Sequence, residues 1–180
     1  MPQRHYDPDK ARFHLKKAGA EGLAVSLSAA DVAFAGAVDA AVLVAEQAKQ
    51  SGITINVVRE PSDGYWSNVW RKKPWCMSYW SGSATEDLMF TSGYSRNSNE
   101  THWSNERFET LLVTAELDDA KRRAMYWEMQ KIVSDDGATI IPVFASYVGA
   151  HSSKVGHPDV IASNYDMDGC KITERWWINS

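Results

Sequence analysis

Helix-like and strand-like segments alternate through the first half of this sequence, and that order restricts the fold more than any other feature. Asp7 suits a helix N-cap, and Pro8 suits the first helical position, where its missing N–H costs nothing. Expected helices cover 8–18, 31–50 and 63–69, and expected strands cover 23–27, 53–58 and 74–80. This order predicts an α/β fold with right-handed crossovers and a mostly parallel sheet with helices on both faces.

The second half is expected to be mainly helical at first and then extended. A polar loop covers 91–101, and Ser104 is expected to cap the helix that follows it. A longer helix is expected over 120–134. Residues 139–148 are expected to be extended, with Pro142 excluding a central ladder position or marking a bulge.

Charge and hydropathy exclude several classes of protein. The net charge of −4 argues against a nucleic-acid binder. No apolar run reaches the roughly 18 residues of a membrane span, and the first residues lack the apolar core of a secretory signal. Cys76 and Cys170 are too few and too far apart for a disulfide framework or a zinc site. Two buried free thiols are expected, and a single bridge between them stays open as the alternative in an oxidising compartment.

Reactive side chains do not form a pattern typical of catalysis. His102 and Glu106 have helical i,i+4 spacing but lack a third metal ligand in register. Cys76 lies inside an apolar strand, where an inert thiol is expected. Glu86 and Asp87 are adjacent and would point about 100° apart on a helix. We therefore expect no enzyme activity, no metal and no cofactor.

The stretch from 75 to 90 is the best candidate for a binding site. An aromatic strand ends at Trp80, a small-residue turn containing Gly82 follows, and Thr85 suits the N-cap of the next helix. A large aromatic side chain at a strand end beside a glycine turn commonly forms one wall of a pocket. A core tryptophan followed by an ordinary strand–helix connection fits the same pattern, so both interpretations stay open.

Three ordered stretches resemble the C-terminal lobe of family 5 extracellular solute-binding proteins, the dipeptide- and oligopeptide-type components of bacterial ABC importers. The first stretch consists of residues 6–11 and 15–19. The second is 52–58, followed later in the chain by Trp80-Ser81-Gly82. The third begins with 103–108 and continues through 122–130 and Asp136 to 141–144. The match covers nearly the whole chain and keeps the family's order.

The resemblance implies a type II periplasmic binding protein lobe. Residues 1–180 would form a single C-terminal ligand-binding lobe, and the N-terminal lobe and signal peptide would lie on polypeptide preceding Met1. The implied partners are a small-molecule or short-peptide solute, the missing lobe and ABC permease subunits, with a periplasmic parent protein. The alternative is a self-contained, aromatic-rich carbohydrate-binding module, whose β-sandwich the expected helices disfavour.

The resemblance also assigns site residues. Trp80, Gly82 and Ser83 would form the lobe's share of the cleft, with Tyr79 and Trp103 as weaker candidates. Dipeptide-binding members carry an aspartate where this chain has Ser83, and that aspartate pairs with the peptide's α-ammonium group. A hydroxyl gives a weaker, uncharged hydrogen bond, which disfavours a peptide with a free N-terminus as the ligand unless Glu86 or Asp87, one helical turn further on, supplies the charge.

Overall fold

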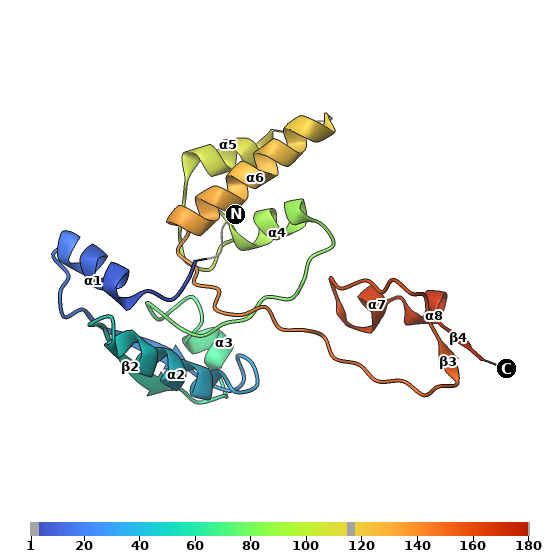
Figure 1. Cartoon of the computed structure of the whole chain (residues 1–180), viewed down its shortest axis with the longest axis horizontal. Coiled ribbons are helices and arrows are strands. Elements are labelled where there is room, and N and C mark those ends of the chain that lie inside the picture. Colours follow the sequence, from blue (N-terminus) through green and yellow to red (C-terminus); the bar gives the residue numbers. More distant parts are fainter. Residues whose placement is uncertain (1–3, 115–117, 180) are drawn as a thin grey trace. The chain divides into compact units, whose positions relative to one another are not determined.

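A computed structural model describes residues 4–114 and 118–179 and divides the chain into two compact units. The first unit extends to Tyr79 and the second begins at Trp80 (Figure 1). Each unit is described by itself below.

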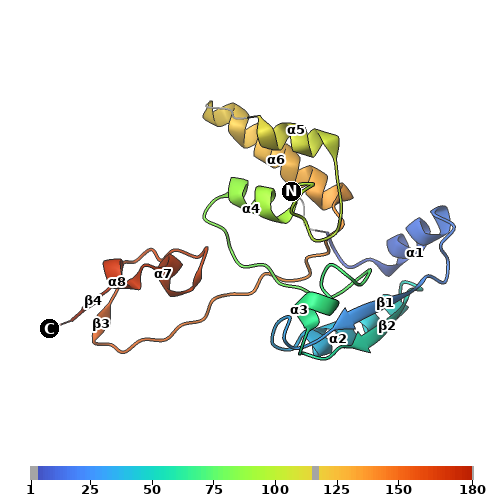
Figure 2. The same ribbon diagram turned by 180° about the vertical axis from the view of Figure 1, so that it is seen from behind.

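The first unit is built on a parallel strand pair. Strand β1 (Ala24–Ala29) pairs with β2 (Thr54–Arg59), and helix α2 (Ala37–Lys49) connects them (Figure 2). Leu27, Ala29 and Ala41 are almost fully buried in one cluster, because small alanine side chains let α2 pack closely on the sheet. Helix α1 (Pro8–Lys17) precedes the pair, and the Asp7 side chain accepts the Lys10 N–H at its start. The predicted α/β order is confirmed here.

Two predicted elements of this unit are shorter than expected. The expected strand at 74–80 joins the sheet only at Cys76, which forms a parallel bridge with Ser28. The Met77 carbonyl instead accepts a hydrogen bond of 2.7 Å from the Tyr65 hydroxyl, on short helix α3 (Tyr65–Asn68). Helix α2 starts later than predicted, because residues 31–36 form turns. The Asp31 side chain accepts a hydrogen bond from the Val38 N–H in the first turn of the helix.

Three helices form the core of the second unit. They are α4 (Glu86–Gly93), α5 (Glu106–Val113) and α6 (Asp119–Asp136). Phe90, Phe108, Leu111 and Met129 are buried together between them. Thr85 caps α4 as predicted, but Asn105 and not Ser104 caps α5, through a bond to the Phe108 N–H. These helices, with the parallel pair of the first unit, are not the elements of the β-sandwich alternative.

A small substructure follows an extended segment in the same unit. Strands β3 (Val155–Gly156) and β4 (Trp177–Ile178) pair antiparallel, with short helices α7 (Asp166–Cys170) and α8 (Ile172–Arg175) between them in sequence. The buried Asp168 carboxylate accepts hydrogen bonds from Ala162 N, Arg175 Nη1 and Trp176 Nε1. The Ala162 bond is the main reason that the pKa of Asp168 is lowered. This carboxylate therefore ties three parts of the substructure together.

Both cysteines are free thiols, as predicted, but Cys170 is exposed and Cys76 only half-buried, so the expectation that both are buried is wrong. Within 4–114 and 118–179, no three His, Cys, Asp or Glu side chains gather as a metal site. The helices of the same described ranges are too short or too polar to cross a membrane.

Candidate functional site

The predicted site residues follow the point where the chain leaves the parallel sheet. After the bridge at Cys76, the chain runs without regular structure to the start of α4. The Tyr79 and Trp80 side chains are 56% and 42% exposed, which excludes a place in the hydrophobic core. In open α/β sheets, ligands bind beyond the carboxyl ends of the strands, and this segment begins there.

The Trp80 ring is hydrogen-bonded through its nitrogen and remains partly exposed to solvent. Its Nε1 donates a hydrogen bond of 3.0 Å to the Glu100 carboxylate, in the loop before α5. Gly93, at the end of α4, lies beside the ring, since a Cβ there would be 4.0 Å from Trp80 Cζ3. The indole therefore has a fixed orientation and an accessible surface, which are the properties that a stacking residue needs.

Gly82 has a structural reason to lack a side chain. A Cβ at this position would lie 1.8 Å from the carbonyl oxygen of Asn164 and 2.8 Å from its carbonyl carbon. Both contacts are with main-chain atoms, which cannot turn away as a flexible side chain could. The sequence predicted close approach of a ligand at Gly82, and the structure places the Asn164 backbone there.

Replacing Gly82 by alanine should destabilise the second unit by ~1–3 kcal/mol, the usual cost of overpacking, because the two backbones must separate. Thermal unfolding followed by circular dichroism measures this loss. Gly149→Ala is the matched control, because a Cβ at Gly149 meets no atom within 4 Å and should leave the melting temperature unchanged. Equal melting temperatures for the two variants would contradict the close approach.

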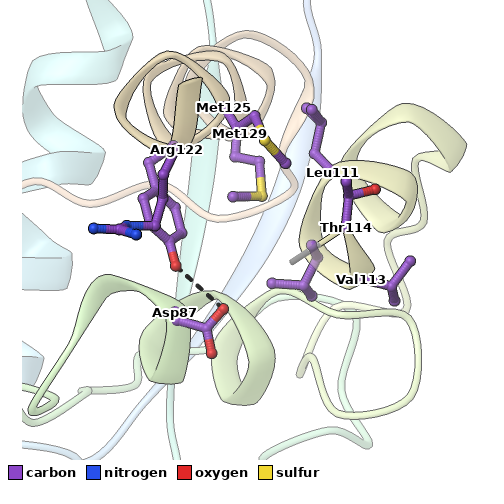
Figure 3. A pocket seen from close by; sticks show the side chains of 9 residues that line it. Asp87, Leu111, Val113, Thr114, Arg122, Met125 and Met129 are labelled. Atoms are coloured by element: carbon purple, nitrogen blue, oxygen red, sulfur yellow. Dashed lines mark hydrogen bonds between the residues drawn. The ribbon is translucent and has the colours of Figure 1, made fainter. Parts of the chain in front are cut away.

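Ser83 and Glu86 share a shallow hollow, whereas Asp87 faces a different one. The first hollow, of about 320 Å³, is lined by Ser83, Ala84, Thr85, Glu86 and Met89, and Ser83 Oγ donates to Met89 Sδ at 3.6 Å. Asp87 lines a second pocket of about 360 Å³ formed by α4, α5 and α6 (Figure 3), where it accepts a 3.3 Å hydrogen bond from the Tyr126 hydroxyl. Of the two acids considered for the missing charge at Ser83, only Glu86 lies beside it.

Tyr79 belongs to an aromatic row in the first unit. Its ring centre lies 5.8 Å from that of Trp66, which lies 6.0 Å from Trp70. The Arg71 guanidinium carbon is 5.6 Å from the Trp70 ring centre, within cation–π range. The helix expected over 63–69 contains Trp66, but sequence reasoning missed this grouping. The spacing of four residues between Trp66 and Trp70 was the available signal.

Trp103 has a mainly structural set of contacts. Its ring centre is 5.3 Å from that of buried Phe108, and its Nε1 donates to Asp136 at 3.2 Å. Asn105 donates to the same carboxylate at 3.1 Å. These bonds hold the start of α5 to the end of α6. Of the predicted site residues, Trp103 is therefore the one whose tryptophan side chain is best explained by structural contacts alone, with no role in ligand binding.

Comparison with solved structures establishes the fold. HbpA2 from Haemophilus parasuis superposes with a TM-score of 0.65 at 17% identity, over 76% of this chain and 29% of that chain. The ABC transporter-associated periplasmic binding protein DppA from Helicobacter pylori, solved with the peptide STSA, gives a TM-score of 0.62 at 18% identity, over 76% of this chain and 28% of that chain. The fold is therefore that of a type II periplasmic binding protein lobe, and this chain spans less than a third of the length of either solved chain.

The family follows from the sequence itself. Residues 1–102, more than half of the chain, match the model of bacterial extracellular solute-binding proteins, family 5 Middle. The chain belongs to this family, which confirms the resemblance found in its motifs. Comparison with curated protein sequences gives no match.

Proposed function

We propose that this chain is one lobe of the solute-binding protein of a bacterial ABC importer, and that the solute is a short peptide or a peptide-like molecule. The observation that carries the proposal is the Trp80 indole, oriented by Glu100 and still 42% exposed where the chain leaves the sheet. Membership of the family supports the transport role, and the peptide bound by the similarly folded DppA supports the solute class.

The proposed site binds and does no chemistry. Trp80 and Tyr79 offer ring faces to an apolar part of the solute, and Ser83 offers a hydroxyl. Glu86, in the same hollow as Ser83, supplies the negative charge for a solute ammonium group. In this proposal Gly82 shapes the segment, and Trp103 supports the helices behind it.

The proposal places the parent protein outside the cytoplasmic membrane. Residues 1–180 would form a single lobe, and a second lobe on polypeptide outside this chain would close over the solute. Permease subunits of the importer would receive the closed protein, and nucleic acid is not among its partners.

Calorimetry with the peptide Ser-Thr-Ser-Ala and with a panel of di- to pentapeptides and sugars tests the function. We expect the 180-residue chain to bind weakly or not at all, because one lobe supplies only part of the contacts of a closed cleft. The complete protein, encoded by the reading frame that contains this chain, should bind a peptide. Micromolar or tighter binding by this chain alone would contradict the one-lobe proposal, and binding of sugars without peptides would contradict the solute class.

A further inference from the structure

The loop that joins α4 to α5, residues 94–105, contains a buried polar side chain (Figure 1). This side chain is Asn99, which is only 4% exposed. A buried amide destabilises a fold unless its N–H groups and its oxygen are hydrogen-bonded, so the partners of Asn99 show what it holds in place. The next residue is Glu100, whose carboxylate accepts the hydrogen bond from Trp80 Nε1 at 3.0 Å.

The Asn99 amide is hydrogen-bonded through both its nitrogen and its oxygen. Its Nδ2 donates to the carbonyl oxygens of Ser95 at 2.8 Å and Trp103 at 2.7 Å, which uses both N–H groups. Its Oδ1 accepts from the backbone N–H groups of Thr101 and Trp103, each at 3.1 Å, and from the Thr101 hydroxyl at 3.2 Å. This one side chain therefore connects the beginning, the middle and the end of the loop.

The backbone of the loop adopts a conformation that needs such support. His102 has a φ of +58°, in the left-handed region that non-glycine residues rarely adopt. It lies between Thr101 and Trp103, the two residues whose N–H groups donate to Asn99. Because the Asn99 oxygen holds the residues on both sides of His102, it stabilises this turn and fixes the path of the backbone that carries Glu100.

We propose that Asn99 is a positioning residue of the solute site, and that it acts through Glu100 on the Trp80 indole. The inference rests on the proposed function, in which this indole binds the solute. Asn99 and Glu100 are adjacent, so a loop fixed by the Asn99 amide also fixes the backbone from which the Glu100 carboxylate reaches Trp80. An indole that is oriented before the solute arrives loses less freedom on binding, which favours affinity.

A purely structural role for Asn99 predicts a different result. In that case the amide would only stabilise the loop, and its loss would affect Trp80 no more than any other loss of stability in the second unit. The two roles differ in whether Asn99 and Glu100 act on Trp80 jointly or independently, and a double-mutant cycle measures this difference.

NMR spectroscopy of the isotope-labelled 180-residue chain measures the effect on Trp80 without any solute. The Trp80 Nε1–H signal is the one that Trp80→Phe removes, and its exchange with water reports on the bond to Glu100. In Asn99→Asp, a carboxylate oxygen replaces Nδ2 and faces the carbonyl oxygens of Ser95 and Trp103, so the bonds that fix the loop are lost. We expect the Trp80 Nε1–H to exchange roughly 10-fold faster in this variant.

The variants of Glu100 complete the cycle. Glu100→Ala should raise the exchange rate of the Trp80 Nε1–H by a similar factor, whereas Glu100→Gln should change it by less than about 2-fold, because the amide oxygen still accepts the bond. The double variant Asn99→Asp/Glu100→Ala should exchange no faster than Glu100→Ala alone. An unchanged exchange rate in Asn99→Asp, or effects of the two changes that multiply in the double variant, would overturn the proposal.

Asp118→Ala is the control for a general loss of stability in the second unit. It removes the N-cap bond to the Lys121 N–H of α6, so the melting temperature should fall by a few degrees while the Trp80 exchange rate stays the same. Helical circular dichroism checks the fold of every variant. If Asn99→Asp unfolds the α4–α6 core, Asn99 is a structural residue and the proposal is wrong.

Calorimetry of the complete protein with the peptide Ser-Thr-Ser-Ala connects the positioning to binding. Asn99→Asp and Glu100→Ala should each weaken binding by roughly 10-fold, because the indole is still present but no longer oriented in advance. Unchanged affinity in a variant whose Trp80 exchange rate has risen would overturn the role in binding. If the unmodified complete protein does not bind the peptide but the NMR cycle gives the expected coupling, the positioning of Trp80 is upheld and only the proposed solute is rejected.

Discussion

Phe108→Ala should unfold most of the helical core of the second unit. Phe108 is fully buried, and its ring contacts those of Phe90 at 5.7 Å and Trp103 at 5.3 Å between centres. Truncation removes the apolar surface that joins α5 to α4 and leaves a cavity that the surrounding helices cannot fill. Replacing a buried phenylalanine by alanine typically lowers the free energy of unfolding by ~3–5 kcal/mol, which is a large part of the stability of a domain of this size. Urea unfolding followed by helical circular dichroism gives the loss.

Phe13→Ala is the matched control for this experiment. Phe13 is the same residue type on α1, but it is 63% exposed, and its replacement should change the free energy of unfolding by less than ~0.5 kcal/mol. Equal losses for the two variants would show that Phe108 is not the centre of the α4–α6 core.

Trp80→Ala should strongly weaken solute binding by the complete protein and leave the fold intact. The indole makes one hydrogen bond, to Glu100, and is 42% exposed, so its loss should cost about 1 kcal/mol of stability, far below the ~3–5 kcal/mol of a core tryptophan. Aromatic residues at the centre of a binding site, in contrast, commonly contribute ~2–4 kcal/mol to affinity. That loss weakens binding by roughly 30- to 1000-fold, which calorimetry detects.

Trp127→Ala separates an effect on binding from a general effect of removing a tryptophan. Trp127 lies on α6 and is 54% exposed, so its replacement should leave both the melting temperature and the affinity unchanged. If Trp80→Ala unfolds the 180-residue chain, Trp80 has a structural role, and the proposed binding site no longer contains the residue on which it mainly depends. Unchanged affinity would reject the site while leaving the family assignment in place.

The elements that the sequence predicted well are those that local chemistry determines. Asp7 and Thr85 cap the helices that they were expected to cap, because a cap depends only on the next few backbone N–H groups. The strand over 53–58 likewise follows from alternating β-branched residues, and it pairs as expected with the strand before α2.

The features that sequence reasoning missed depend on partners far away in the chain. Nothing near Gly82 shows that the Asn164 backbone approaches it. The residues near Met77 likewise do not show that its carbonyl accepts a hydrogen bond from the Tyr65 hydroxyl. With that bond, the expected strand at 74–80 pairs with β1 only through the single bridge at Cys76. Glu86 and Asp87 are neighbours in sequence, yet helix geometry directs them into separate hollows. These contacts require the tertiary structure, which periodicity does not contain.

The Asp168 carboxylate affects the order in which the chain can fold during synthesis. Ala162 and Asp168 leave the ribosome before Arg175 and Trp176, which supply the other two donors. Until both have emerged, burial would strip water from a charged group without replacing the lost hydrogen bonds. Complete hydrogen bonding of the buried Asp168 carboxylate therefore comes only after the segment that begins at Arg175 has been made.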